Sequence, residues 1–205
     1  MPRMDLTMKT LLPLSLLIVA LTATAPARAD SRVDIIPSVA YINPTTDVVD
    51  QDGITARFDA TLGFGGRIAI YLNETVSLDL SGHYGRSSLA ADIFGDPDAA
   101  SVDLALFYGS AQLAVALGSE KRFILHGGVG LQGTNYDDFI EGGNIMTGVL
   151  GLSGWMPLSP TAALRVDFDA HFHTTYFEVG DVRTDELSQL DTVLAVGIQF
   201  TSGGR

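Results

Sequence analysis

The segment 163–176 reads ALRVDFDAHFHTTY, and apolar and polar side chains alternate along it. Leucine, valine, phenylalanine and tyrosine share one face, while arginine, aspartate and histidine share the other. A period of two is the pattern of a β-strand whose two faces meet different surroundings. The segment 75–84, TVSLDLSGHY, repeats the pattern. Both segments are long for strands of a globular protein, so they predict an extended sheet with one apolar and one polar face.

Six further segments have strand character, and the connections between all eight alternate in length. Residues 72–74 and 117–121 are short connections, whereas residues 43–60 and 85–101 are long ones. This alternation is typical of outer-membrane barrels, which have tight turns at the periplasmic end and long outer loops. We predict an all-β fold, an eight-stranded antiparallel up-and-down transmembrane β-barrel. The six further strands are Val33 to Tyr41, Thr61 to Tyr71, Val102 to Ala116, Arg122 to Thr134, Asn144 to Trp155 and Thr192 to Phe200.

For two of these strands, 102–116 and 144–155, the sequence does not decide which face points inward, because both faces are apolar. In the other six strands the apolar faces carry no charge, as expected where a lipid-facing charge is costly. Aromatic residues lie near the strand ends, which is typical of interfacial girdles. Tyr41, Tyr84 and Tyr176 lie at the outer ends, and Phe123, Trp155 and Phe200 lie at the inner ends. A soluble periplasmic binding barrel with the opposite faces turned inward remains an alternative, because alternation is the same in both settings.

The composition of the 205 residues excludes several classes of protein. There is no cysteine, so the chain has neither disulfides nor thiolate sites. Lys and Arg number 12 against 24 Asp and Glu, a formal net charge of -12 that offers no surface for nucleic acid. The long apolar run lies at 11–23, which excludes a bundle of membrane-spanning helices.

The N-terminal segment has the three parts of a secretory signal peptide. Lys9 gives a positive start, an apolar stretch follows from Leu11, and Ala27-Arg28-Ala29 is a small-x-small cleavage site. Met8 fits the start of such a peptide better than Met1. We therefore expect residues 1–29 to be a signal peptide and residues 30–205 to be the barrel domain of an exported, strongly acidic protein.

Four glycine-rich or aromatic strand segments, at Pro37 to Tyr41, Leu62 to Arg67, His126 to Gly130 and Val196 to Phe200, carry a resemblance. With the signal peptide, they resemble the eight-stranded outer-membrane β-barrel family of the OmpA-barrel, OmpX and OmpW type. The resemblance implies a place in the outer membrane of a Gram-negative envelope, with membrane lipid and lipopolysaccharide around the barrel. It also implies that the barrel-assembly machinery reads Phe200, the aromatic residue that closes the last strand.

If the apolar faces meet lipid, the polar faces line the interior. We expect a filled lumen, because eight strands enclose just enough space for side chains and buried charges need partners. Asp169 and His171 could instead form a general base, or His171 and His173 could bind a metal. The predicted lumen network consists of Arg67, Asp79, His83, Arg122, His126, Arg165, Asp167, Asp169, His171 and His173, with Gln199 on the same face.

The acidic residues concentrate in the long connections, which are the outward-facing variable surface of such a barrel. We expect a monomeric structural or adhesive protein, without a cofactor, whose acidic extracellular loops contact an unidentified partner. A narrow channel for small or apolar molecules is the alternative, and a hydrolase acting on lipid or peptide is a further one. The acidic positions include Asp47, Asp50, Asp52, Asp92, Asp96, Asp98, Asp137, Asp138, Glu141, Asp181, Asp185 and Glu186.

Overall fold

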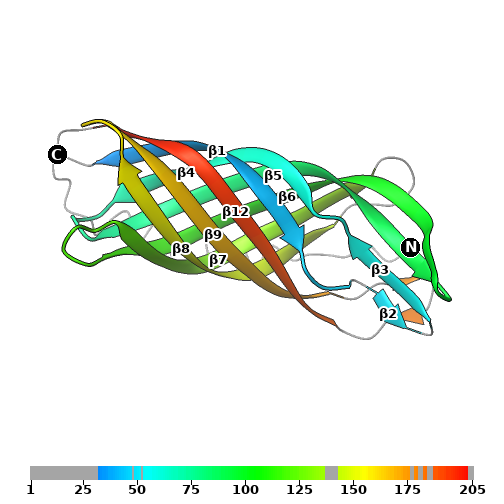
Figure 1. Cartoon of the computed structure of the whole chain (residues 1–205). Helices are drawn as coiled ribbons and strands as arrows, with labels where there is room; N and C mark the ends of the chain where they lie inside the picture. Colours follow the sequence, from blue (N-terminus) through cyan, green and yellow to red (C-terminus); the bar gives the residue numbers. More distant parts are fainter. Residues whose placement is uncertain are drawn as a thin grey trace. The chain divides into compact units, whose positions relative to one another are not determined.

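Eight long antiparallel strands form a closed ring in the computed structural model, which describes residues 32–47, 49–51, 53–136, 143–175, 178–179, 182–183 and 187–202 (Figure 1). Around the ring the order is β5, β4, β1, β12, β9, β8, β7 and β6, and β6 pairs back with β5. The predicted fold is confirmed. The strands are β1 (Val33–Pro44), β4 (Thr61–Tyr71), β5 (Val76–Ile93), β6 (Asp96–Leu117), β7 (Phe123–Tyr136), β8 (Asn144–Pro157), β9 (Ala162–Thr175) and β12 (Leu187–Ser202).

Four short strands lie within connections that the sequence predicted as loops. β2 (Val49–Gln51) and β3 (Ile54–Phe58) lie between β1 and β4, while β10 (Glu178–Val179) and β11 (Val182–Arg183) form a separate two-stranded sheet. β3 continues along β5 beyond the start of β4, and β2 pairs with β3. The predicted connection 43–60 is therefore largely sheet.

The predicted long loop at 85–101 is wrong. β5 extends to Ile93, and β6 begins at Asp96 after a turn at Phe94 and Gly95, which have φ angles of 53° and 83°. The pairing between the strands continues to Ala91 opposite Ala100 and, after a shift of register, to Ile93 opposite Asp96. The hairpin contains many small and polar residues, and its backbone groups are paired although apolar and polar side chains do not alternate. A prediction from alternation therefore did not detect these strands. β12 likewise begins at Leu187, five residues before the predicted start.

Pro37 lies in the interior of β1, where it has no N–H to donate. The pairing of β1 with β12 passes from Ile35 opposite Phe200 to Ser38 opposite Gly197, with neither Ile36 nor Pro37 paired in between. On its other edge β1 stays paired with β4 at both residues. The proline thus interrupts one ladder over two residues and leaves the register unchanged.

The outer face of the barrel is apolar and the inner face is buried. Leu62 and Phe64 are 77% and 66% exposed, and they belong to the face predicted to meet lipid. The two ambiguous strands are now assigned: Leu104 and Tyr108 of β6, and Ser153 of β8, point inward. No helix long and apolar enough to cross a membrane occurs in the described part of the chain. The predicted signal peptide at 1–29 and the predicted rim residue Tyr176 lie outside the described residues.

The predicted aromatic residues lie at both ends of this belt. Tyr41 and Tyr84 are exposed toward the β5–β6 hairpin, and Phe123 and Phe200 are exposed at the opposite end, where the turns are short. Trp155 is half-buried there, and its indole Nε1 donates to the backbone oxygen of Lys121 at 2.8 Å. A band between two aromatic rims is the arrangement that a bilayer requires.

Candidate functional site

Two arginines cross the middle of the lumen and bind three carboxylates. Arg67 of β4 reaches Asp79 at 3.3 Å, Asp169 at 2.6 Å and Asp167 at 3.4 Å. Arg165 of β9 reaches Asp167 at 2.9 Å and Asp79 at 3.2 Å. All five side chains are almost fully buried. Since alternation turns every second residue of β4, β5 and β9 inward, these groups converge from three strands.

His126 of β7 joins this centre through both ring nitrogens. Its Nε2 lies 2.8 Å from the hydroxyl of Ser153, which donates to Asp167. Its Nδ1 contacts Oε1 of Gln112, whose amide donates to Asp169 at 3.0 Å. His126 is thus connected to both carboxylates through neighbouring polar side chains.

The charges of the centre largely offset one another. Arg67 and Arg165 face three aspartates, and His126 Nδ1 lies 3.3 Å from Asp169. Buried charges are tolerated when each is paired and hydrogen-bonded, and Ser77 adds a further hydrogen bond of 2.6 Å to Asp79. We call these six titratable groups, with Ser77, Gln112 and Ser153, the central network.

A second polar group lies nearer the β5–β6 hairpin and centres on Tyr108 of β6. Its hydroxyl donates to Asp191 of β12 at 2.8 Å and accepts from Gln132 of β7 at 3.0 Å. The ring of Tyr108 contacts His171 edge-on at 5.1 Å between centroids. His171 in turn hydrogen-bonds Thr147 at 3.1 Å. This group adds a second set of side chains across the lumen.

The remaining predicted residues are distributed along the interior, with one exception. His83 hydrogen-bonds Ser38 at 3.1 Å, and His173 lies 4.0 Å from Asp191. Gln199 donates to Asp34 at 2.6 Å near the end with short turns.

The exception is Arg122, which the sequence placed in the lumen. Its side chain is half exposed and pairs with Glu120 at 2.8 Å. The physical reason is that β7 begins one residue later, at Phe123. Arg122 therefore belongs to a turn, where the alternation of a strand no longer decides which way a side chain points.

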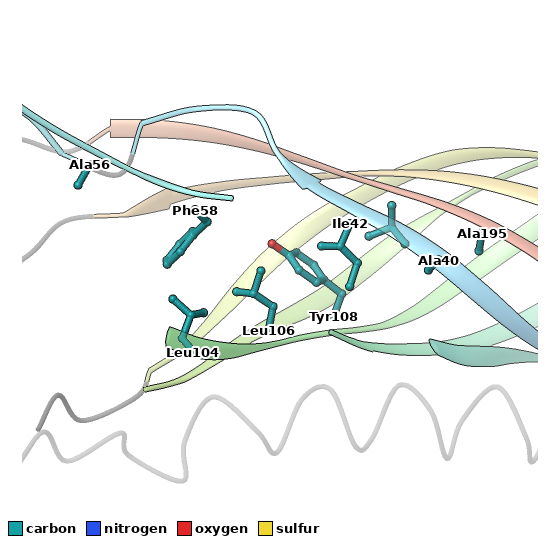
Figure 2. Packing of buried hydrophobic residues seen from close by; sticks show 9 residues of the cluster. Ala40, Ile42, Ala56, Phe58, Leu104, Leu106, Tyr108 and Ala195 are labelled. Atoms are coloured by element: carbon teal, nitrogen blue, oxygen red, sulfur yellow. The ribbon is translucent and has the colours of Figure 1, made fainter. Parts of the chain in front are cut away.

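An apolar cluster fills the lumen beyond Tyr108, and the sequence analysis missed it. Phe58 of β3, Leu104 and Leu106 of β6, and Ile42 of β1 are all under 8% exposed (Figure 2). In Figure 2 these side chains point toward one another across the space between the strands. The signal was present in the two-sided apolar character of 102–116, which reflects lipid on one face and this cluster on the other. The full set is Ala40, Ile42, Ala56, Phe58, Leu104, Leu106, Tyr108, Val193 and Ala195.

The predicted pair of Asp169 and His171 does not form a general base. Asp169 bonds Arg67 and Gln112, whereas His171 bonds Thr147. Ser153, His126 and Asp169 have the order of a nucleophile, a base and an orienting acid. However, Ser153 gives its hydrogen to Asp167 and is 1% exposed. The hydroxyl of Ser153 is thus hydrogen-bonded to a carboxylate inside the lumen.

Among the described residues, no group of three histidine, aspartate or glutamate side chains is placed to hold a metal ion. His171 and His173 lie on one strand and face separate partners, Thr147 and Asp191.

A comparison of the sequence with protein-family models and with curated proteins finds no match. Solved structures do match. The outer membrane protein OprG from Pseudomonas aeruginosa aligns with a TM-score of 0.63 at 12% identity, over 85% of this chain and 97% of that chain. The solid-state NMR structure of outer membrane protein AlkL aligns with a TM-score of 0.54 at 16% identity, over 87% and 95%. Ail, the attachment invasion locus protein of Yersinia pestis, in complex with the heparin analogue sucrose octasulfate, aligns with a TM-score of 0.52 at 12% identity, over 84% and 99%.

The chain has the fold of the eight-stranded outer-membrane β-barrel proteins. As in such a barrel, each strand of the ring is paired with a neighbour on both sides, so the ring has no free edge for lipid to meet. The exposed apolar belt between two aromatic rims completes the arrangement of a barrel whose outer face meets lipid. Its short turns mark the periplasmic end, and the β5–β6 hairpin marks the outer end.

Proposed function

We propose that this outer-membrane barrel is a closed, non-catalytic scaffold that presents its outer end to a partner. The observation that carries the proposal is the filling of the lumen. The central network and the apolar cluster cross the interior at different heights, and their side chains are almost fully buried. A lumen packed in this way leaves no continuous path for solutes, so the outward surface is the part available for function.

The outer end supplies a built surface for such contacts. β5 and β6 continue as a hairpin beyond Tyr84, and β3 and β2 add to its edge. The hairpin's outward face is polar, with Arg86, Ser88 and Asp103, whereas its inward face packs Leu104 and Leu89 against the apolar cluster. Recognition sites commonly lie on surfaces held by a rigid scaffold.

The charge of the chain constrains the partner. Ail, which has the same fold, is named for attachment and invasion and is seen with a sulfated ligand. This chain has a net charge of -12 and many aspartates in its outer connections. A polyanion would be repelled, so we propose a neutral or cationic partner, contacted by a monomeric barrel.

Phe200 has a separate proposed role in assembly. It lies at the periplasmic end of β12, is 51% exposed and pairs with Ile35 and Ala162. An exposed aromatic side chain on the last strand is accessible before the ring closes, which supports its proposed recognition by the barrel-assembly machinery. Residues 203–205 lie outside the described residues.

Two measurements on the same protein test the closed-scaffold proposal. In planar lipid bilayers, the purified barrel should produce no conductance steps. On cells, replacing residues 91–100 with an Asn-Gly turn should abolish adhesion to a cationic or neutral surface, while the same turn in place of 158–161, at the periplasmic end, should leave adhesion unchanged. Steady conductance would contradict the proposal, and so would adhesion that survives the loss of the hairpin tip.

A narrow route for small or apolar molecules is the second candidate, and one observation favours it. Residues 45–47 run alongside β12, where Thr45 N is hydrogen-bonded to Leu190 O at 3.1 Å, whereas β3 runs alongside β5. The two segments 43–47 and 57–60 therefore separate, and a cavity of about 370 Å³ lies between them beside Phe58. Uptake of an apolar solute should then fall when Ala60→Trp fills this cavity, and unchanged uptake would argue against the route. A change in uptake on replacing Arg67 or Asp79 would instead indicate passage through the centre.

A further inference from the structure

Phe94 lies in the turn of the β5–β6 hairpin and is 81% exposed, more than any other large hydrophobic side chain among the described residues. It follows the rim residue Tyr84 by ten residues, roughly 30 Å of strand, so lipid around the barrel does not account for its exposure. Its φ angle of 53° lies in the left-handed region, which is unfavourable for a bulky residue. Exposure and backbone strain at one residue point to a role in binding and not in packing.

Two neighbouring turns hold this residue in place. Phe94 N donates to the backbone oxygen of Gly53 at 2.8 Å, and Gly95 N donates to Oδ1 of Asp92 at 2.9 Å. The ring lies against Gly53, where an added Cβ would come within 3.0 Å of Cδ1 of Phe94. The aromatic side chain is therefore positioned before any partner arrives, which lowers the entropic cost of binding.

The inward face of β3 and β5 is apolar from the lumen as far as this turn. Three cross-strand pairs follow one another along it, and their exposure increases outward. Phe58 is 7% exposed, whereas Ile54 and Ile93 are 38% and 37% exposed. We call Ile54, Ile93 and Phe94 the apolar tip. From the lumen outward, the pairs are Phe58 with Leu89, Ala56 with Ala91 and Ile54 with Ile93.

The chain around the apolar tip is acidic. The segments 47–56 and 87–103 contain three and four aspartates respectively, with neither lysine nor arginine. Two of these aspartates, Asp92 and Asp96, border the turn that carries Phe94, and Asp96 is exposed. An apolar patch with negative charge around it is complementary to an apolar pocket with positive charge around it. An anionic membrane surface would be repelled.

We propose that the apolar tip binds a protein partner through an apolar pocket bordered by lysine or arginine. Phe94 enters the pocket, and Asp92 and Asp96 face the basic side chains at its rim. A central aromatic side chain surrounded by polar contacts is the usual arrangement of a binding hot spot. This inference rests on the proposed function, which places the partner at the outer end, and it adds the chemistry that the partner offers.

Biosensor surfaces coated with three copolymers test the proposal on the barrel in zwitterionic nanodiscs: lysine–phenylalanine, lysine–serine and glutamate–phenylalanine. The wild type should bind the first at least about tenfold more tightly than either other surface, because each of those lacks one half of the hot-spot contacts. Phe94→Asn should remove the preference for lysine–phenylalanine over lysine–serine, since asparagine tolerates a positive φ and keeps the turn. Asp96→Asn should weaken binding to both lysine surfaces alike.

The matched control is Leu158→Asn, which removes a side chain that is 56% exposed at the periplasmic end. It should leave all three affinities unchanged, and a heat-dependent gel shift should show that each variant is folded. The proposal is overturned if Phe94→Asn binds lysine–phenylalanine as the wild type does, if Leu158→Asn weakens binding equally, or if the glutamate–phenylalanine surface binds as tightly.

The variant with an Asn-Gly turn in place of 91–100 separates this inference from the proposed function. If it loses binding while Phe94→Asn keeps it, other residues of the outer end make the contact and only the present inference fails. If it binds as the wild type does, the proposed function fails as well. Phe94-dependent flotation of the nanodiscs with phosphatidylcholine vesicles would show that the tip enters a bilayer, and it would overturn a protein partner.

Discussion

Arg67 is the residue that holds most of the central network together, because it lies within 3.4 Å of three carboxylates. Replacing it with alanine leaves buried negative charge without compensation, which costs about 3–5 kcal/mol. Arg67→Ala should lower the free energy of unfolding in lipid vesicles by that amount. Unfolding in urea can be followed through the fluorescence of Trp155, the single tryptophan of the chain. Arg122→Ala, at an exposed ion pair, should change stability by no more than about 0.5 kcal/mol, and equal effects would refute the distinction.

His126 carries a prediction that can be read directly from its ring. We expect His126 to donate from both Nε2 and Nδ1, because Ser153 and Gln112 each give a hydrogen to an aspartate. The ¹⁵N spectrum of selectively labelled protein in micelles at pH 7 should therefore show two protonated nitrogens for His126. A signal from a ring nitrogen without hydrogen would show that the network is one positive charge short. His126→Ala identifies the resonance.

At the scale of single residues, the sequence predicted the charged side chains of the lumen better than the apolar ones. Period two placed Arg67, Asp79 and Asp169 inside because their strands have one clearly apolar face. Tyr108 and Leu104 could not be assigned, because lipid outside and packing inside both favour apolar side chains. The hydrogen-bond partners of His126 come from other strands, and no local pattern contains that information.

Among the elements, β4 and β5 show how glycine sets the strand spacing. A Cβ added to Gly65 would overlap the carbonyl oxygen of Gly82 and crowd His83. Gly65→Ala should therefore force the two strands apart and lower stability by about 1–3 kcal/mol, the usual cost of overpacking. At Gly148 a Cβ would meet only Phe172 O, at 3.9 Å. Gly148→Ala should leave the unfolding transition nearly unchanged, and similar losses for both variants would show that spacing is not the cause.

The existence of all eight strands of the ring was predictable from the sequence, whereas the length was predictable for only some of them. β4 matches its prediction residue for residue, because polar turns bound it on both sides. β5 and β6 extend much further than predicted, since their outer halves leave the membrane and no longer need one apolar and one polar face. The hydrogen bonds of the hairpin, not side-chain alternation, define the element there.

For the molecule as a whole, closure of the ring predicts resistance to detergent. The unheated protein in dodecyl sulfate should migrate differently from the boiled protein, because every strand of the closed ring is paired on both edges. A chain that ends at residue 186, and so lacks β12, should show a single mobility at both temperatures. A mobility shift in the truncated chain would mean that an open sheet suffices for this resistance.

The pairing of Val33 with Ser202 brings the two ends of the described barrel side by side. The order of strands around the ring therefore has no physical beginning, and the position where the chain starts is a property of the gene and not of the fold. Closely spaced ends tolerate circular permutation. A chain reopened at the periplasmic turn 118–121, with a short linker joining 202 to 32, would enclose the same lumen while presenting a different strand last to whatever closes it.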